Sequence, residues 1–87
     1  MEDSKIARFI FKRKPYLLLK ALRSKDGIYS AQLAKQIDCS YAYIVRLINQ
    51  MEKLGLVYIE RTKNVNYIKL TKKGRQLIDL VSSIEDL

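Results

Sequence analysis

The sequence predicts a mainly α-helical (α+β) fold in which two closely spaced helices are followed by a small β-hairpin and a last helix. Three observations predict it. Apolar residues recur at helical spacing over 41–54, and Gly55 stands where that helix should end. Two short runs rich in β-forming residues, 56–62 and 67–71, are separated by four turn-like residues. A chain of 87 residues is expected to form one domain, which buries roughly 60% of the surface that its unfolded form exposes.

Two helices are expected before the central pair. Residues 4–13 mix apolar and basic side chains, which fits a short helix, although Phe9-Ile10-Phe11 also suits an extended segment. Pro15 suits the first turn of a second helix, where a missing N–H costs nothing. This helix is expected to end at Asp26-Gly27, and the residues on its inner face are Leu18, Ala21 and Leu22.

The central segment has the pattern of a helix-turn-helix. After a very short extended piece at Ile28-Tyr29, Ser30 suits the N-cap of a helix over 31–37. Its inward-facing residues are expected to be Leu33, Ala34 and Ile37. Residues 38–40 form the turn, and Ser40 caps the longer helix over 41–54. The apolar stripe of this helix is Ile44, Leu47, Ile48 and Met51, so the two helices and their short turn form the motif.

The rest of the chain is predicted to form the hairpin and one more helix. Residues 63–66 are turn-like and join the two strands. Thr71 can cap a helix that starts at Lys72, and Gly74 slightly weakens its first turn. The apolar face of this helix is expected to contain Leu77, Ile78 and Val81, with Ile84 or Leu80.

The charge is distributed unevenly along the chain. The formal net charge is +8, and residues 1–27 contribute +5 from eight basic and three acidic side chains. Residues 28–54 contribute +1, residues 55–75 contribute +5 and residues 76–87 contribute −3. Two separate basic blocks favour a binding surface for a polyanion, whereas a solvated lysine-rich surface stays open as the alternative.

Composition argues against several other classes of protein. The chain has no histidine and one cysteine, so we expect neither an intramolecular disulfide nor a catalytic site built on a His base, and neither a metal site nor a cofactor. Cys39 is expected to pack in the interior. No apolar run reaches the roughly 18 residues of a membrane span, and the acidic start Met1–Ser4 does not resemble a signal peptide. We therefore expect a non-enzymatic, cytoplasmic protein that does not enter a membrane.

Three runs of the chain carry a family pattern: Leu33-Ala34-Lys35-Gln36-Ile37, Met51-Glu52-Lys53-Leu54-Gly55-Leu56-Val57, and Leu70-Thr71-Lys72-Lys73-Gly74-Arg75. Together they resemble the winged helix-turn-helix of MarR-like DNA-binding proteins, over residues 15–82 or so. The resemblance implies a double-stranded DNA-binding transcriptional regulator with the recognition helix 41–54 in the major groove and the wing 58–69 on adjacent backbone or in the minor groove. Many members carry an Asp-Arg-Arg cluster in the wing, where this chain has Lys63-Asn64-Val65-Asn66.

The candidate contact residues follow from the helical wheel and from the resemblance. The side of helix 41–54 opposite its apolar stripe carries Arg46 and Asn49, with Gln50 beside them, and such side chains match the edges of DNA bases. The DNA-binding candidates are Ser40, Tyr41, Ala42, Tyr43, Arg46, Asn49, Gln50, Arg61, Lys63 and Asn64. The candidates for phosphate contact are Lys53, Lys72, Lys73 and Arg75. The two tyrosines have packing as their alternative, and the basic wing has protection of an edge strand.

The ends of the chain are candidates for self-association. MarR-like proteins dimerise through their terminal helices, which implies a homodimer. Residues 1–14 and 76–87 would then flank a DNA-binding unit over 15–75, and the interface candidates are Ile6, Phe9, Ile10, Phe11, Leu77, Leu80, Val81 and Ile84. Two alternatives share this fold: a protein–protein interaction module in a transcription or replication assembly, and a non-specific chromatin protein.

Overall fold

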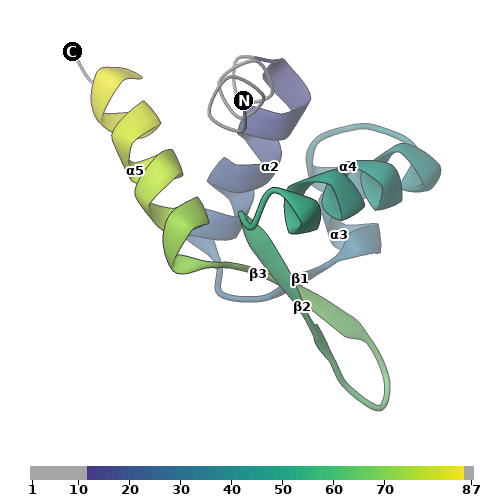
Figure 1. The fold of residues 1–87 in the computed structure, drawn as a ribbon. Helices are drawn as coiled ribbons and strands as arrows, with labels where there is room; N and C mark the ends of the chain where they lie inside the picture. Colours follow the sequence, from purple (N-terminus) through teal and green to yellow (C-terminus); the bar gives the residue numbers. More distant parts are fainter. Residues whose placement is uncertain (1–11, 86–87) are drawn as a thin grey trace.

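The computed structural model describes residues 12–85, which form four helices and a three-stranded antiparallel sheet (Figure 1). The elements in chain order are α2 (Arg13–Ser24), β1 (Ile28–Tyr29), α3 (Ser30–Gln36), α4 (Tyr41–Lys53), β2 (Val57–Arg61), β3 (Asn66–Leu70) and α5 (Lys72–Glu85). This order confirms the predicted fold class. The helix predicted over 4–13, with Ile6, Phe9, Ile10 and Phe11, lies outside the described residues up to residue 11.

The predicted apolar faces meet in one core. All four residues of the α4 stripe are at most 3% exposed, and Leu18 and Leu22 of α2 face them with at most 1% exposure. Helix α2 begins at Arg13, two residues earlier than predicted, so Pro15 lies third in the helix. Pro15 is tolerated there because the N–H groups of a first turn have no partner within the helix.

The N-cap of α3 was predicted one residue too late. Tyr29 holds the N-cap position and Ser30 is the first helical residue. The backbone N–H of Tyr29 donates to Oε1 of Gln32 at 3.3 Å, so the glutamine side chain in the first turn reaches back and closes the helix end. The predicted inner residues Leu33, Ala34 and Ile37 are buried.

The caps predicted for α4 and α5 are both formed. The hydroxyl of Ser40 accepts a hydrogen bond from the N–H of Tyr43 at 3.1 Å, and that of Thr71 accepts one from the N–H of Gly74 at 3.0 Å. Helix α4 passes into the hairpin at Gly55, whose φ of +76° lies in the left-handed region that glycine adopts readily. The two ends of the hairpin are therefore set by local sequence.

The sheet has the strand order β1-β3-β2, and its register separates two faces. Ile28 and Ile59 both pair with Ile68 on the face that packs on the helices, so neighbouring pairs such as Tyr29 with Tyr67 lie on the other face. The hairpin turn spans 62–65, not 63–66, because Asn66 pairs with Arg61 as part of β3. Figure 1 shows the hairpin projecting away from the helices as a wing.

Candidate nucleic-acid interface

The outward side of α4 carries an uncovered polar ridge. Because the apolar stripe of α4 faces the core, the opposite side of the helix is turned to solvent. The residues of this α4 ridge are all exposed: Ala42, Arg46, Asn49 and Lys53. Ion pairs within residues 12–85 engage Lys20, Arg23 and Lys69, which lie on other elements. The ridge thus presents one guanidinium, one amide and one ammonium group to an outside partner.

The two tyrosines near the start of α4 occupy different environments. Tyr41 is 59% exposed, on the edge of α4 that faces the wing. Tyr43 is partly buried against the core, on the edge that faces the start of α2. Gln50 is exposed on the same edge as Tyr43. Tyr43 therefore packs against the core and also lies beside the ridge, whereas Tyr41 extends into solvent.

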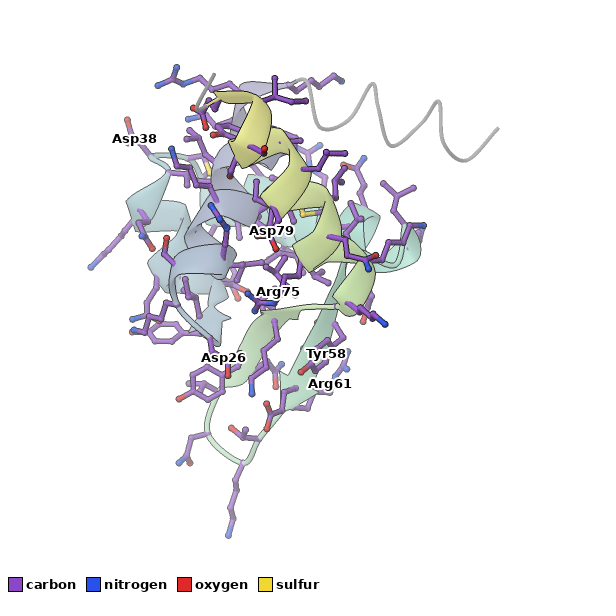
Figure 2. The ribbon with its side chains drawn as sticks, turned by 90° about the vertical axis from the view of Figure 1, so that its left-hand side faces the viewer. Asp26, Asp38, Tyr58, Arg61, Arg75 and Asp79 are labelled. Atoms are coloured by element: carbon purple, nitrogen blue, oxygen red, sulfur yellow. The ribbon has the colours of Figure 1, made fainter. Side chains whose placement is uncertain are left out.

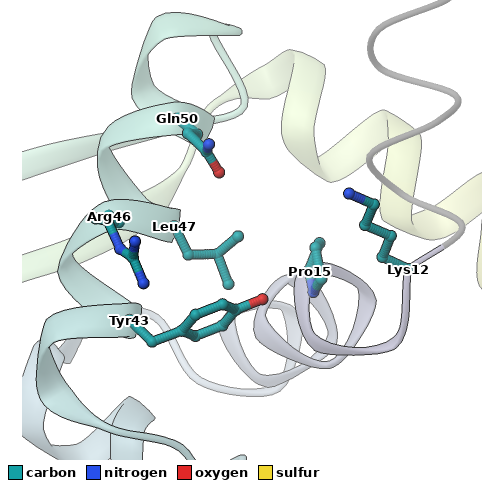
Figure 3. A pocket seen from close by; sticks show the side chains of 6 residues that line it. All are labelled: Lys12, Pro15, Tyr43, Arg46, Leu47 and Gln50. Atoms are coloured by element: carbon teal, nitrogen blue, oxygen red, sulfur yellow. The ribbon is translucent and has the colours of Figure 1, made fainter.

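A hollow lies on each side of the α4 ridge. The α2-side hollow has a volume of about 280 Å³ and is lined by Lys12, Pro15, Tyr43, Arg46, Leu47 and Gln50 (Figure 3). The wing-side hollow has a volume of about 160 Å³, and its polar lining residues are Ser30, Tyr41, Asn49 and Asn66. The floor of the wing-side hollow is formed by apolar side chains of α4, β2 and β3. No pattern in the sequence predicted that Lys12, Ser30 and Asn66 line these hollows, because these residues meet α4 only in the folded chain.

The wing presents its basic residues near its end. Arg61, Lys63 and Asn64 are all exposed, and Arg61 is cross-strand partner to Asn66 of the wing-side hollow. By contrast, the ammonium group of Lys69 lies 2.5 Å from the Glu60 carboxylate. Its hydrogen bond to Glu60 raises the pKa of Lys69 above its ordinary value, so the lysine stays charged within a neutral pair. The positive charge of the outer wing therefore comes from Arg61 and Lys63.

The cations at the base of the wing differ in their surroundings. In Figure 2, Arg75 lies between the wing, which carries Tyr58 and Arg61, and the middle of α5, which carries Asp79. Lys72 and Arg75 are exposed. The ammonium group of Lys73 donates to the carbonyl of Leu54 at 3.1 Å, at the C-terminal end of α4. Lys73 thus has a structural role in addition to the phosphate contact predicted for it.

Part of the first basic block is neutralised inside the molecule. Arg23 of α2 donates to the Asp79 carboxylate of α5 at 2.8 Å, and the ammonium group of Lys20 lies 3.9 Å from the Glu85 carboxylate. The acidic end of the chain therefore meets the basic block along α2. Exposed pairs of this kind add little stability, so their main effect is to reduce the charge that α2 offers to a partner.

Lys14 of α2 forms hydrogen bonds with the turn of the helix-turn-helix. Its ammonium group donates to the carbonyl oxygens of Ile37 at 2.8 Å and of Asp38 at 3.0 Å. Ile37 is the C-cap of α3, and Asp38 is the next residue, whose φ of +54° lies in the left-handed region. A cation at the C-terminal end of a helix also interacts favourably with its dipole. The turn that sets α4 against α3 is thereby tied to the first turn of α2.

The apolar residues of α5 divide into two groups. Leu77 and Val81 pack partly against the core, and the line Gly74, Ile78 and Ser82 is buried. Leu80 and Ile84 are 61% and 62% exposed. Since they are four residues apart, they lie next to each other on one side of the helix. Of the predicted interface candidates on α5, these two remain fully available to a second molecule.

Residues 12–85 include the single cysteine of the chain. Cys39 is partly buried and packs against the core. In this part of the chain no three acidic or Cys side chains gather where they would hold a metal ion. Across the same residues, every helix is too short or too polar to span a membrane.

No protein-family model matches the chain. An uncharacterized protein of Archaeoglobus fulgidus is 25% identical over 91 residues, which span all of this chain and 95% of that protein. A solved structure from Archaeoglobus fulgidus matches with a TM-score of 0.80 and 23% identity, over 91% of each chain.

Solved transcription regulators have the same fold, and a MarR family protein from Bacillus stearothermophilus matches with a TM-score of 0.83 and 20% identity, over 98% of this chain and 61% of that one. MepR of Staphylococcus aureus, a transcription regulator of the multidrug efflux pump MepA, matches with a TM-score of 0.84 and 24% identity. The match covers 98% of this chain and 65% of MepR, so this chain spans about two thirds of the length of MepR. A structure of MepR in complex with DNA matches with a TM-score of 0.83 and 22% identity, over 97% of this chain and 72% of that one. The chain therefore has the winged-helix fold that these regulators share.

Proposed function

We propose that this protein is a double-stranded DNA-binding transcriptional regulator that inserts α4 into the major groove and places the wing on adjacent backbone or in the minor groove. The observation that carries the proposal is the α4 ridge, whose Arg46 and Asn49 are exposed and unshielded by other parts of residues 12–85. An α-helix fits the major groove, and these side chains match base edges there. The likeness to a regulator whose structure was solved with DNA supports the same use of the fold.

Arg61, Lys63 and Asn64 are the wing contacts in this proposal, and the contacts to phosphate are Lys53, Lys72, Lys73 and Arg75. Ser40, Tyr41, Ala42 and Tyr43 belong to the first turn of the recognition helix, whose start lies deepest in the groove. A DNA-binding role also requires access to the chromosome, so a cytoplasmic, nucleoid-associated location is part of the proposal.

Salt dependence tests whether the basic surface binds DNA. We expect the logarithm of the association constant for duplex DNA to fall linearly with the logarithm of salt concentration, with a slope of about −0.9 for each neutralised phosphate. Binding to random duplexes, followed by selection, is expected to enrich a palindrome. Salt-dependent binding without enrichment would instead support a chromatin protein. Absence of binding to any duplex would contradict the DNA-binding role and favour the protein–protein interaction module.

We also propose that the protein is a homodimer, with residues 1–14 and 76–87 at the interface around a DNA-binding unit over 15–75. Leu80 and Ile84 support this because they place two large apolar side chains side by side in solvent. A dimer would set two copies of α4 about 34 Å apart, one turn of DNA.

Sedimentation measures this association directly. The wild-type chain is expected to sediment at twice the monomer mass, and the double variant Leu80→Glu, Ile84→Glu as a monomer, because two charges would be buried in the contact. Gln36→Glu is the control, since Gln36 is exposed on α3, outside the proposed interface. A wild-type monomer at high micromolar concentration would contradict the dimer.

A further inference from the structure

The two hollows beside the α4 ridge suggest how the protein holds the two DNA strands. If α4 lies in a major groove about 12 Å wide, the sugar-phosphate backbones that border the groove run along the two flanks of the helix. Those flanks are where the hollows lie: one between α4 and the start of α2, the other between α4 and the wing. We propose that each hollow seats phosphates of one strand, by ionic contact on the α2 side and by neutral hydrogen bonds on the wing side. This proposal rests on the proposed function.

The α2-side hollow is cationic. Lys12 enters it from the start of α2, and Arg46 enters it from the ridge. Figure 3 shows the ammonium group of Lys12 directed across the hollow toward α4, with the hydroxyl of Tyr43 and the amide of Gln50 on the opposite wall. Ammonium, guanidinium, hydroxyl and amide groups all donate hydrogen bonds, which is the chemistry that phosphate oxygens accept. Lys12 is exposed, and the acidic residues of the described chain lie outside the lining of this hollow.

The wing-side hollow offers donors without charge. Its lining contains the hydroxyls of Ser30 and Tyr41 and the amide of Asn66, beside Asn49 of the α4 ridge, and neither a cation nor a carboxylate. Tyr41 is 59% exposed, so its hydroxyl can reach a backbone beside the helix. Hydroxyl and amide side chains are regular phosphate ligands in protein–DNA interfaces. A contact of this kind fixes position but releases fewer counterions than an ionic one.

The two flanks should therefore respond differently to salt. Removing a cation that neutralises a phosphate makes the salt slope shallower by about 0.9. Removing a neutral donor should lower affinity without changing the slope, by roughly two- to tenfold for one hydrogen bond. This contrast separates the two kinds of contact within one set of measurements.

The experiment measures binding of the full chain to its selected duplex over a range of salt concentrations. On the α2 side the variant is Lys12→Gln, and its control is Lys25→Gln, which removes the same charge beyond the other end of α2, about 18 Å along the helix. On the wing side the variants are Tyr41→Phe and Asn66→Ala. Their control is Tyr58→Phe, which removes a hydroxyl from the sheet face that points away from α4. All five positions are exposed, and thermal unfolding verifies that each variant is folded.

We expect Lys12→Gln to make the slope shallower by about 0.9 and Lys25→Gln to leave it near the wild-type value. Tyr41→Phe and Asn66→Ala should lower affinity at an unchanged slope, while Tyr58→Phe should bind as the wild type does. Equal slopes for the two lysine variants, or wild-type affinity for both wing-side variants, would overturn the assignment of the hollows. A wild-type chain that binds no duplex would instead contradict the DNA-binding role itself.

Discussion

Replacing Gly74 with alanine is expected to destabilise the folded chain by about 3 kcal/mol or more. A Cβ added at Gly74 would lie 1.9 Å from the carbonyl oxygen of Leu56, far inside van der Waals contact. Overpacking typically costs about 1–3 kcal/mol and at times more, and here the obstructing atom belongs to the backbone and cannot rotate away. For a domain of this size, a loss of 3 kcal/mol lowers the melting temperature by about 12–24 °C.

The backbone at this point has little freedom to move. The carbonyl of Leu56 accepts a hydrogen bond from the N–H of Thr71 at 3.1 Å, and the Thr71 hydroxyl donates to the carbonyl of Gly55 at 2.6 Å. The start of α5 is thereby fixed against the end of α4, immediately before the wing. A displaced α5 would disturb both of these hydrogen bonds.

Thermal unfolding followed by circular dichroism measures the effect of Gly74→Ala. Ser83→Ala serves as the control, because Ser83 is exposed on the same helix and its replacement should change stability by less than about 0.5 kcal/mol. A melting temperature for Gly74→Ala equal to or above that of the wild type would show that the close approach of α5 to Leu56 does not exist in solution.

The sequence alone predicts the opposite sign for this substitution. Alanine is a better helix former than glycine by about 1 kcal/mol, so helix propensity alone predicts that Gly74→Ala stabilises α5. In the structure, the missing side chain of Gly74 allows the first turn of α5 to pack directly against the backbone of Leu56. Such a contact joins residues 18 positions apart and leaves no periodic trace in the sequence, so local propensity cannot reveal it.

Features that depend on neighbours within one turn of helix could be predicted. The α4 stripe, the caps at Ser40 and Thr71, and the end of α4 at Gly55 all follow from spacings of one to four residues. Contacts between elements could not. Lys14 donates to the C-cap of α3 from 23 residues away, and Lys12 lines a hollow together with residues of α4, because these elements meet only in the folded chain.

The charge pattern along the sequence indicated the kind of partner, but it did not indicate which individual cations are free to contact that partner. Two basic blocks flank the nearly neutral residues 28–54, which favoured a polyanion as partner. In the folded chain, however, Arg23 faces Asp79 and Lys69 faces Glu60, so these cations have partners within the molecule. The sequence showed how much charge each block carries, but only packing determines which cations remain available to a polyanion.

Arg46→Ala is expected to weaken binding to the selected duplex by about 1–3 kcal/mol, or roughly 5- to 150-fold, and binding to unrelated duplexes much less. The reason is that a guanidinium in the major groove can hold a guanine edge by two hydrogen bonds, and the wrong base cannot replace them. Equilibrium binding to the selected site and to a scrambled duplex at one salt concentration measures both values.

Lys53→Ala is the matched control for Arg46→Ala. Lys53 lies on the same ridge two turns further along α4 and is assigned to phosphate, so its loss should weaken both duplexes equally. Arg46 belongs to the α4 ridge and also lines the α2-side hollow, so its guanidinium can contact either a base or the phosphate backbone. If Arg46→Ala weakens both duplexes to the same extent, Arg46 joins Lys12 as a phosphate contact. Base recognition would then depend on Asn49 and Gln50, the remaining exposed side chains of α4 whose amides match the edge of adenine.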